Sequence, residues 1–123
     1  MKKILIVEDE EIMLNLLEKK LKTHGYKVFS ARDGELGLSF LREQDSPDLI
    51  LMDLIMPKLD GFSVMAEIQK DDRLKKIPLI VISNSGQPVE LNKIKELGAI
   101  DWLVKTEFDP QELLEKIKKQ LGE

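Results

Sequence analysis

The chain has 123 residues, 42% of them hydrophobic and 34% charged, which predicts one globular domain over residues 1–123. The formal net charge of −4 gives no reason to expect binding to nucleic acid or to an anionic membrane. The absence of cysteine excludes disulfide and thiol chemistry, and with a single histidine it argues strongly against a zinc site. No apolar run approaches the length of a membrane span, and the N-terminus has no signal-peptide pattern, so we expect a cytoplasmic protein.

The hydrophobic pattern predicts five strands that alternate with five helices. The strands are short apolar runs, and the helices carry leucine and isoleucine at intervals of three or four residues. In chain order we expect strands at 3–7, 27–31, 49–52, 79–82 and 100–104. The helices should begin near residues 11, 33, 60, 88 and 109.

This alternation predicts an α/β fold, a doubly wound five-stranded parallel sheet with helices on both faces. The strands that end at Val7, Met52 and Ile82 are solidly apolar and should be central. The strands that begin at Lys27 and Ile100 contain polar residues and should lie at the edges. The strand order 2-1-3-4-5 satisfies both conditions and places a crevice at the carboxyl ends of the strands, beside the first and third.

Polar residues follow four of the predicted strands, and the third strand runs directly into an acid, Asp53. Because the carboxyl ends of parallel strands share one edge of the sheet, Asp53 should meet Glu8, Asp9, Ser83 and Lys105 there. Three carboxylates repel one another, and a hard cation such as Mg²⁺ relieves that repulsion. A lysine and a serine hydroxyl suit a phosphoryl group, and an aspartate can be phosphorylated as a nucleophile.

Each of these residues also has a structural interpretation. Asp53 reads as a turn residue or helix cap, Glu8 and Asp9 as acids at a helix start, Ser83 as a turn residue and Lys105 as a solvated strand end. Taken singly, these interpretations are the better ones. Their occurrence together at the ends of four strands favours a joint site.

The motifs at 4–10, 47–57, 60–61, Ser83 and 98–105 fall in an order and spacing that resembles the receiver domain of two-component response regulators. The resemblance extends from the first strand to the last helix, and the motif at 47–57 is its most specific part. It implies a flavodoxin-like fold of the CheY-like superfamily and a role as a phosphoprotein in phosphorelay signal transduction.

The resemblance implies that Asp53 takes a phosphoryl group from a phosphohistidine on a histidine kinase or phosphotransfer protein. Ser83 would bind a phosphoryl oxygen, and Lys105 would offset its charge. The residues implied as Mg²⁺ ligands are Glu8, Asp9, Asp53 and, through its backbone carbonyl, Ile55. Such a chain is not an enzyme with a separate substrate, although it promotes its own phosphorylation and dephosphorylation.

The resemblance also implies a conformational switch at Ser83 and Trp102, read out on the face formed by residues 88–120. That face would contact a downstream protein or a second copy of the chain in a homodimer. No DNA-binding or enzymatic segment follows the last helix here, so we expect output by protein–protein contact, from a free-standing regulator or from part of a longer chain.

Three residues depart from the family pattern. Asn84 stands where a small residue is usual, so Asn84, together with Ile55, would tune access to Asp53. Thr106 replaces a proline that usually follows the lysine in a cis bond, and since a cis bond to a non-proline residue costs roughly 2.5–4 kcal/mol, we expect a trans bond. Trp102 replaces a smaller aromatic. We therefore expect phosphorylation to be retained with an altered switch, and a phosphorylated structure with Trp102 buried against Ser83 would contradict this.

Three other functions are compatible with parts of the sequence. A flavodoxin-like cofactor binder is disfavoured because the acids at 8–11 would repel a phosphate. A phosphatase of the haloacid-dehalogenase type needs a second aspartate where Ile55 stands. The strongest alternative is a degenerate receiver that binds partner proteins without phosphorylation; Asn84 and Thr106 favour it, whereas the acids, Ser83 and Lys105 oppose it.

Overall fold

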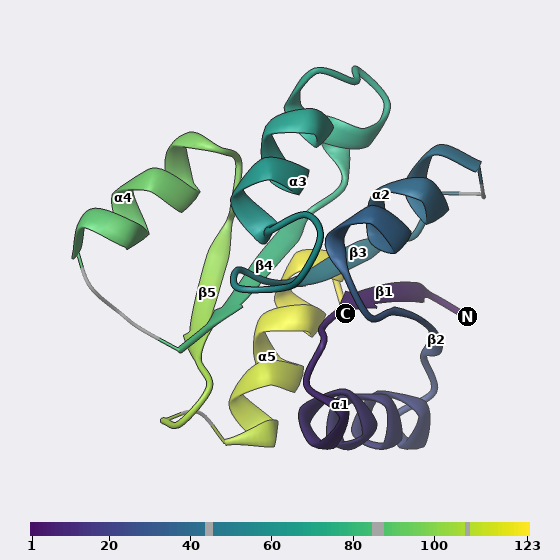
Figure 1. Ribbon diagram of the computed structural model, residues 1–123. Helices are drawn as coiled ribbons and strands as arrows, with labels where there is room; N and C mark the ends of the chain where they lie inside the picture. The colour runs from purple at the N-terminus through teal and green to yellow at the C-terminus, as the bar shows by residue number, and fades with distance from the viewer. Residues whose placement is uncertain (44–45, 85–87, 108) are drawn as a thin grey trace.

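Five parallel strands form the centre of the fold, and helices pack on both faces of the sheet (Figure 1). The computed structural model describes residues 1–43, 46–84, 88–107 and 109–123. The strands are β1 (Lys3–Val7), β2 (Lys27–Ala31), β3 (Leu49–Asp53), β4 (Leu79–Ser83) and β5 (Asp101–Val104). The helices are α1 (Glu11–Thr23), α2 (Gly34–Glu43), α3 (Gly61–Gln69), α4 (Pro88–Glu96) and α5 (Pro110–Leu121), with a 3₁₀ turn, η1 (Leu74–Lys76), before β4.

The strand order is β2-β1-β3-β4-β5, and every pairing is parallel, which confirms the predicted sheet. All side chains of β3 and β4 are buried, as are those of β1 from Ile4 to Val7, because helices cover both faces of these central strands. The edge strands β2 and β5 are only partly buried. The expected division into central and edge strands is therefore confirmed as well.

Two apolar layers hold the helices to the sheet. Alternate strand residues such as Leu5 and Val7 point into one layer, which packs beneath α2, α3 and α4. Their neighbours Ile4 and Ile6 point into the other layer, which packs against α1 and α5. Figure 1 shows the two groups of helices on opposite sides of the sheet. Each fully buried leucine or isoleucine contributes roughly 1.5–3 kcal/mol.

None of the helices in the described ranges combines the length and the apolar character needed to cross a bilayer.

The start of α3 packs tightly against the end of β3. The Gly61 amide donates a hydrogen bond to the Leu54 carbonyl at 2.8 Å. A Cβ atom at Gly61 would lie 2.2 Å from the carbonyl oxygen of Asp53, far inside contact distance. Asp60 then caps the helix by accepting a hydrogen bond from the Ser63 amide at 2.8 Å. The backbone position of Asp53 therefore depends on the absence of a side chain at Gly61.

Replacing Gly61 with alanine should force the end of β3 to move, because the added methyl group meets backbone atoms that cannot rotate away. We expect the Gly61→Ala variant to lose about 2 kcal/mol in the free energy of unfolding, measured by urea titration. Ser39→Ala, at an exposed position of α2, should stay within about 0.5 kcal/mol of wild type. Equal stability of wild type and Gly61→Ala would contradict the tight packing.

Candidate functional site

The predicted site residues lie at the carboxyl edge of the sheet, at or just beyond the ends of four strands. Asp53 and Ser83 are the last residues of β3 and β4, and Glu8 and Lys105 follow β1 and β5. The register pairs Asp53 with Ile82, the residue before Ser83. The Lys105 amide donates to the Ser83 carbonyl at 2.7 Å, which extends the ladder between β4 and β5. Parallel pairing in this register brings these residues to one edge.

Three carboxylates cluster there. Glu8, Asp9 and Asp53 each offer one oxygen, and these oxygens lie within 4.8 Å of one another. Glu8 is 1% and Asp53 3% exposed, whereas Asp9 is exposed. One oxygen of Asp53 accepts a hydrogen bond from the Leu54 amide at 2.8 Å. The structure therefore joins two buried acids and one exposed acid at a single point.

Lys105 is the cation of this cluster. Its ammonium lies 2.8 Å from Glu8 Oε1, 3.2 Å from Asp53 Oδ2 and 3.8 Å from Glu10 Oε2, and its side chain is 5% exposed. The bond to Thr106 is trans, as expected, since the described residues contain no cis peptide bond. Lys105 thus reaches Asp53 with a trans bond to Thr106.

Burial raises the pKa of the Asp53 carboxyl to about 8, with a further increase from the adjacent Glu8 and an opposing effect of Lys105. Burial alone would lower the pKa of Lys105, but its contacts with Glu8 and Asp53 outweigh that effect and raise it. The ammonium therefore stays charged at neutral pH, while Asp53 keeps a proton in the absence of a further cation. One lysine is not enough to hold all the carboxylates of the cluster ionised.

The cluster fits a divalent cation. Glu8 Oε1 is buried and accepts no hydrogen bond among the described residues, because the 2.8 Å contact with Lys105 lacks hydrogen-bond geometry. A metal ion would stabilise such a buried carboxylate oxygen. Mg²⁺ prefers oxygen ligands, typically carboxylates together with several water molecules. The exposed Asp9 completes such an oxygen set. The backbone carbonyl of Ile55, in the loop after β3, stays a prediction as a ligand.

The hydroxyl of Ser83 makes a contact that the sequence pattern did not predict. Ser83 is 3% exposed, and its Oγ donates a hydrogen bond to Glu90 Oε1 at 2.6 Å. Glu90 lies in the first turn of α4, where an acid is ordinary because it favours the helix dipole. Because this local explanation is sufficient, the sequence pattern did not indicate the contact of Glu90 with Ser83. Asn84 and Ile55, which we expected to tune access, are both exposed.

Trp102 is half-buried on β5 and packs against the layer beneath α2, α3 and α4. The ammonium of Lys95, on α4, lies 5.1 Å from the centre of its ring. This arrangement matches the interpretation of Trp102 as a partly buried edge-strand aromatic. Its role in a switch stays a prediction.

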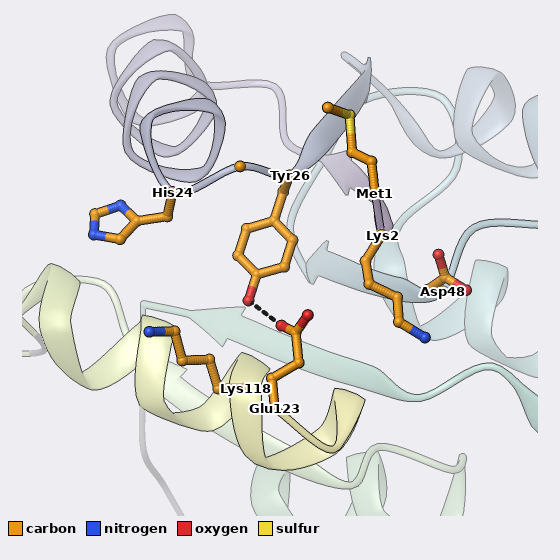
Figure 2. A pocket seen from close by; sticks show the side chains of 8 residues that line it. Met1, Lys2, His24, Tyr26, Asp48, Lys118 and Glu123 are labelled. Atoms are coloured by element: carbon orange, nitrogen blue, oxygen red, sulfur yellow. Dashed lines mark hydrogen bonds between the residues drawn. The ribbon is translucent and has the colours of Figure 1, made fainter.

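A cavity of about 680 Å³ lies at the opposite, amino edge of the sheet, away from Asp53. Lys2 precedes β1 and Tyr26 precedes β2, and both line this cavity with residues near the end of α5 (Figure 2). The Tyr26 hydroxyl donates to Glu123 at 2.7 Å, and burial together with this carboxylate raises the pKa of Tyr26 to about 12. The contact ties the last residue of the chain to the start of β2, and the cavity is no part of the acidic site.

Comparison with known proteins identifies the family. Residues 4–118 match the response regulator receiver domain. The chain is 41% identical over 119 residues to a probable transcriptional regulator, ycf27, of Guillardia theta, covering 97% of this chain and 45% of that protein. It therefore spans about half the length of the curated relatives that it matches.

Two solved structures resemble the fold and are informative about the site. One is the phosphorylated cyanobacterial phytochrome response regulator RcpA, with a TM-score of 0.83 and 33% identity, covering 96% of this chain and 89% of that one. The other is the receiver domain of the sensor histidine kinase PA1611 of Pseudomonas aeruginosa, with magnesium in its active-site cleft, a TM-score of 0.89 and 29% identity, covering 99% and 98%. The strand order, the acidic cluster and these matches together show that the chain belongs to the response regulator receiver domain family.

Proposed function

We propose that this chain is a phosphoacceptor of a two-component system, in which Asp53 takes a phosphoryl group from a phosphohistidine on a histidine kinase or phosphotransfer protein. The observation that carries the proposal is the environment of Asp53: a buried strand-end carboxylate beside two further acids, with the Lys105 ammonium at 3.2 Å. A purely structural ion pair does not need the third acid, the exposed Asp9. The PA1611 and RcpA structures, one with magnesium and one phosphorylated, support the same assignment by similarity.

In the proposed reaction, the Asp53 carboxyl first loses its proton to solvent, and an oxygen of the resulting carboxylate attacks the phosphorus of the phosphohistidine. The phosphorus–nitrogen bond breaks, its electron pair goes to the imidazole, and Asp53 becomes an acyl phosphate. Lys105 offsets the added negative charge as a point charge, and Ser83 donates a hydrogen bond to a phosphoryl oxygen. Glu8, Asp9, Asp53 and the Ile55 carbonyl would hold Mg²⁺, which when bound would supply positive charge to the site. In this proposal the chain promotes its own phosphorylation and dephosphorylation and is not an enzyme with a separate substrate.

The output of the phosphorylated state would be a change on the face made by α4, β5 and α5, read by a downstream protein or by a second copy of the chain. A phosphoryl group can shift this equilibrium only through contacts that the free carboxylate lacks. Lys105 already lies 3.2 Å from the free carboxylate, so the new contact here would be the hydrogen bond from Ser83. Several relatives are transcriptional regulators of about twice this length, so a DNA-binding output outside this domain fits the family. The location in the cytoplasm stays a prediction.

Incubation with acetyl phosphate and Mg²⁺ should add the mass of one phosphoryl group to the intact protein, since Asp53 lies beside the exposed Asp9 at the edge of the sheet. The gain should vanish in Asp53→Ala and in a chelator, and persist in Asp72→Asn, whose altered side chain is 94% exposed. A gain that survives in Asp53→Ala would contradict the assignment of Asp53. No gain in wild type, together with no binding of Mg²⁺, would favour the phosphorylation-independent interaction module.

The raised pKa of Asp53 predicts a pH-dependent stability in the absence of divalent ions. The native carboxyl keeps its proton up to a pH of about 8, whereas the unfolded chain loses it near pH 4. Between these values the native state binds more protons, so the free energy of unfolding falls as pH rises. Asp53→Asn removes this effect, and its stability relative to wild type should grow by roughly 3 kcal/mol from pH 5 to pH 8.

Urea unfolding with a chelator at several pH values measures this difference. The control variant Asp72→Asn, at an exposed site, should follow wild type across the range. A stability difference between Asp53→Asn and wild type that stays constant with pH would contradict a raised pKa at Asp53.

A further inference from the structure

Glu90, in the first turn of α4, is hydrogen-bonded to Ser83 at the end of β4, so it links this helix to the acidic site. Its Oε1 accepts the hydrogen bond of the Ser83 hydroxyl at 2.6 Å. Ser83 is almost completely buried, and Glu90 is half-buried in the first turn of α4. A bond this short between a hydroxyl and a carboxylate is of the strong, charge-assisted kind.

Few of the side chains that the structure describes on α4 are buried against the sheet. Ile94 is the one fully buried side chain among those described on this helix, and Leu91 and Leu97 pack only partly against the layer beneath α2, α3 and α4. Two lysines of α4 also contact aromatic rings: the ammonium of Lys93 lies 4.3 Å from the centre of the Phe62 ring, and that of Lys95 lies 5.1 Å from the centre of the Trp102 ring. Figure 1 shows α4 at the outer edge of the molecule, beyond β5. The hydrogen bond from Ser83 to Glu90 is thus a polar contact between the end of β4 and the first turn of α4.

A serine hydroxyl has one proton and can donate it to one acceptor at a time. In this structure Ser83 donates it to Glu90. A phosphoryl group on Asp53, the neighbouring strand end, would need the same proton for its own hydrogen bond. The two acceptors therefore compete, and both are anions, so Glu90 cannot replace the lost proton with one from the phosphoryl group.

We propose that Glu90 is a latch that holds the Ser83 hydroxyl and the first turn of α4 together in the unphosphorylated protein, and that phosphorylation of Asp53 releases it. The inference rests on the proposed function of Asp53 and adds a positioning residue to it. When Ser83 turns its hydroxyl toward the phosphoryl oxygen, the hydrogen bond to Glu90 breaks and α4 loses its polar attachment to β4. Phosphorylation of Asp53 would thus affect α4 because the Ser83 hydroxyl changes its acceptor from Glu90 to a phosphoryl oxygen.

Hydrogen exchange of the α4 amides tests the latch with acetyl phosphate and Mg²⁺ as the phosphorylating probe. In unphosphorylated protein, Glu90→Ala should exchange about tenfold faster in α4 than wild type, because a hydrogen bond to a charged group has been lost. Glu90→Gln should lie between them, since its amide oxygen still accepts from Ser83 without the charge. Glu96→Ala removes an exposed acid from the last turn of the same helix and should match wild type.

Phosphorylated wild type should approach the exchange rate of Glu90→Ala, and phosphorylation of Glu90→Ala should accelerate α4 little further. Equal acceleration by phosphorylation in wild type and Glu90→Ala would overturn the latch, because it would mean that Glu90 only stabilises the helix. Intact mass on the same samples reports phosphorylation separately. If wild type neither gains a phosphoryl group nor binds Mg²⁺, the proposed function fails. Equal exchange in unphosphorylated Glu90→Ala and Glu96→Ala would overturn the latch independently of that result.

Discussion

The structure depends on one electrostatic constraint: two buried carboxylates and an exposed one meet at the edge of a sheet with a single ammonium to balance them. Glu8 and Asp53 are nearly inaccessible to water, and Lys105 contacts both. Removing such groups from water is costly unless each has a partner. The surplus of acid leaves Asp53 with a raised pKa and one Glu8 oxygen without a hydrogen bond. Both features are those of a site that gains stability from an added cation.

The remainder of the fold serves to hold this unfavourable arrangement in place. The central strands β1, β3 and β4 are buried on both faces, and their register sets the ends of β3 and β4 side by side. Gly61 lets α3 begin against the carbonyl of Asp53. Apolar burial in two layers supplies the stability that the charged edge lacks. The strands with the most completely buried side chains thus carry Asp53, whose ionised form is disfavoured by that burial.

The helix α4 is less buried than these central strands. It has one fully buried side chain among those described, and its polar attachment runs through a hydroxyl that lies beside the site. A weakly held element next to a site of strong charge is well suited to respond when that charge changes, because a small difference in free energy decides its position. We therefore explain coupling between Asp53 and α4 by the weak burial of α4 next to the charged site. A long chain of contacts is not required.

The strand order and the meeting of Asp53 with Lys105 could be predicted from the sequence, because apolar central strands and the geometry of parallel sheets leave few alternatives. Which acids are buried could not be predicted: Glu8 and Asp9 are adjacent and alike in sequence, yet only Glu8 is enclosed. Glu90 gave no signal, since an acid in a first helical turn has a sufficient local reason to be there. Contacts between side chains on separate elements depend on how those elements pack, which hydrophobic periodicity does not encode.

Calorimetric titration with Mg²⁺ at pH 7, in two buffers of different ionisation enthalpy, tests the central claim most directly. If Asp53 is protonated without the ion and joins its ligands when the ion binds, binding should release on the order of one proton. Asp53→Asn should abolish that release and weaken binding. Binding that releases no proton, or that is the same in Asp53→Asn, would contradict the account.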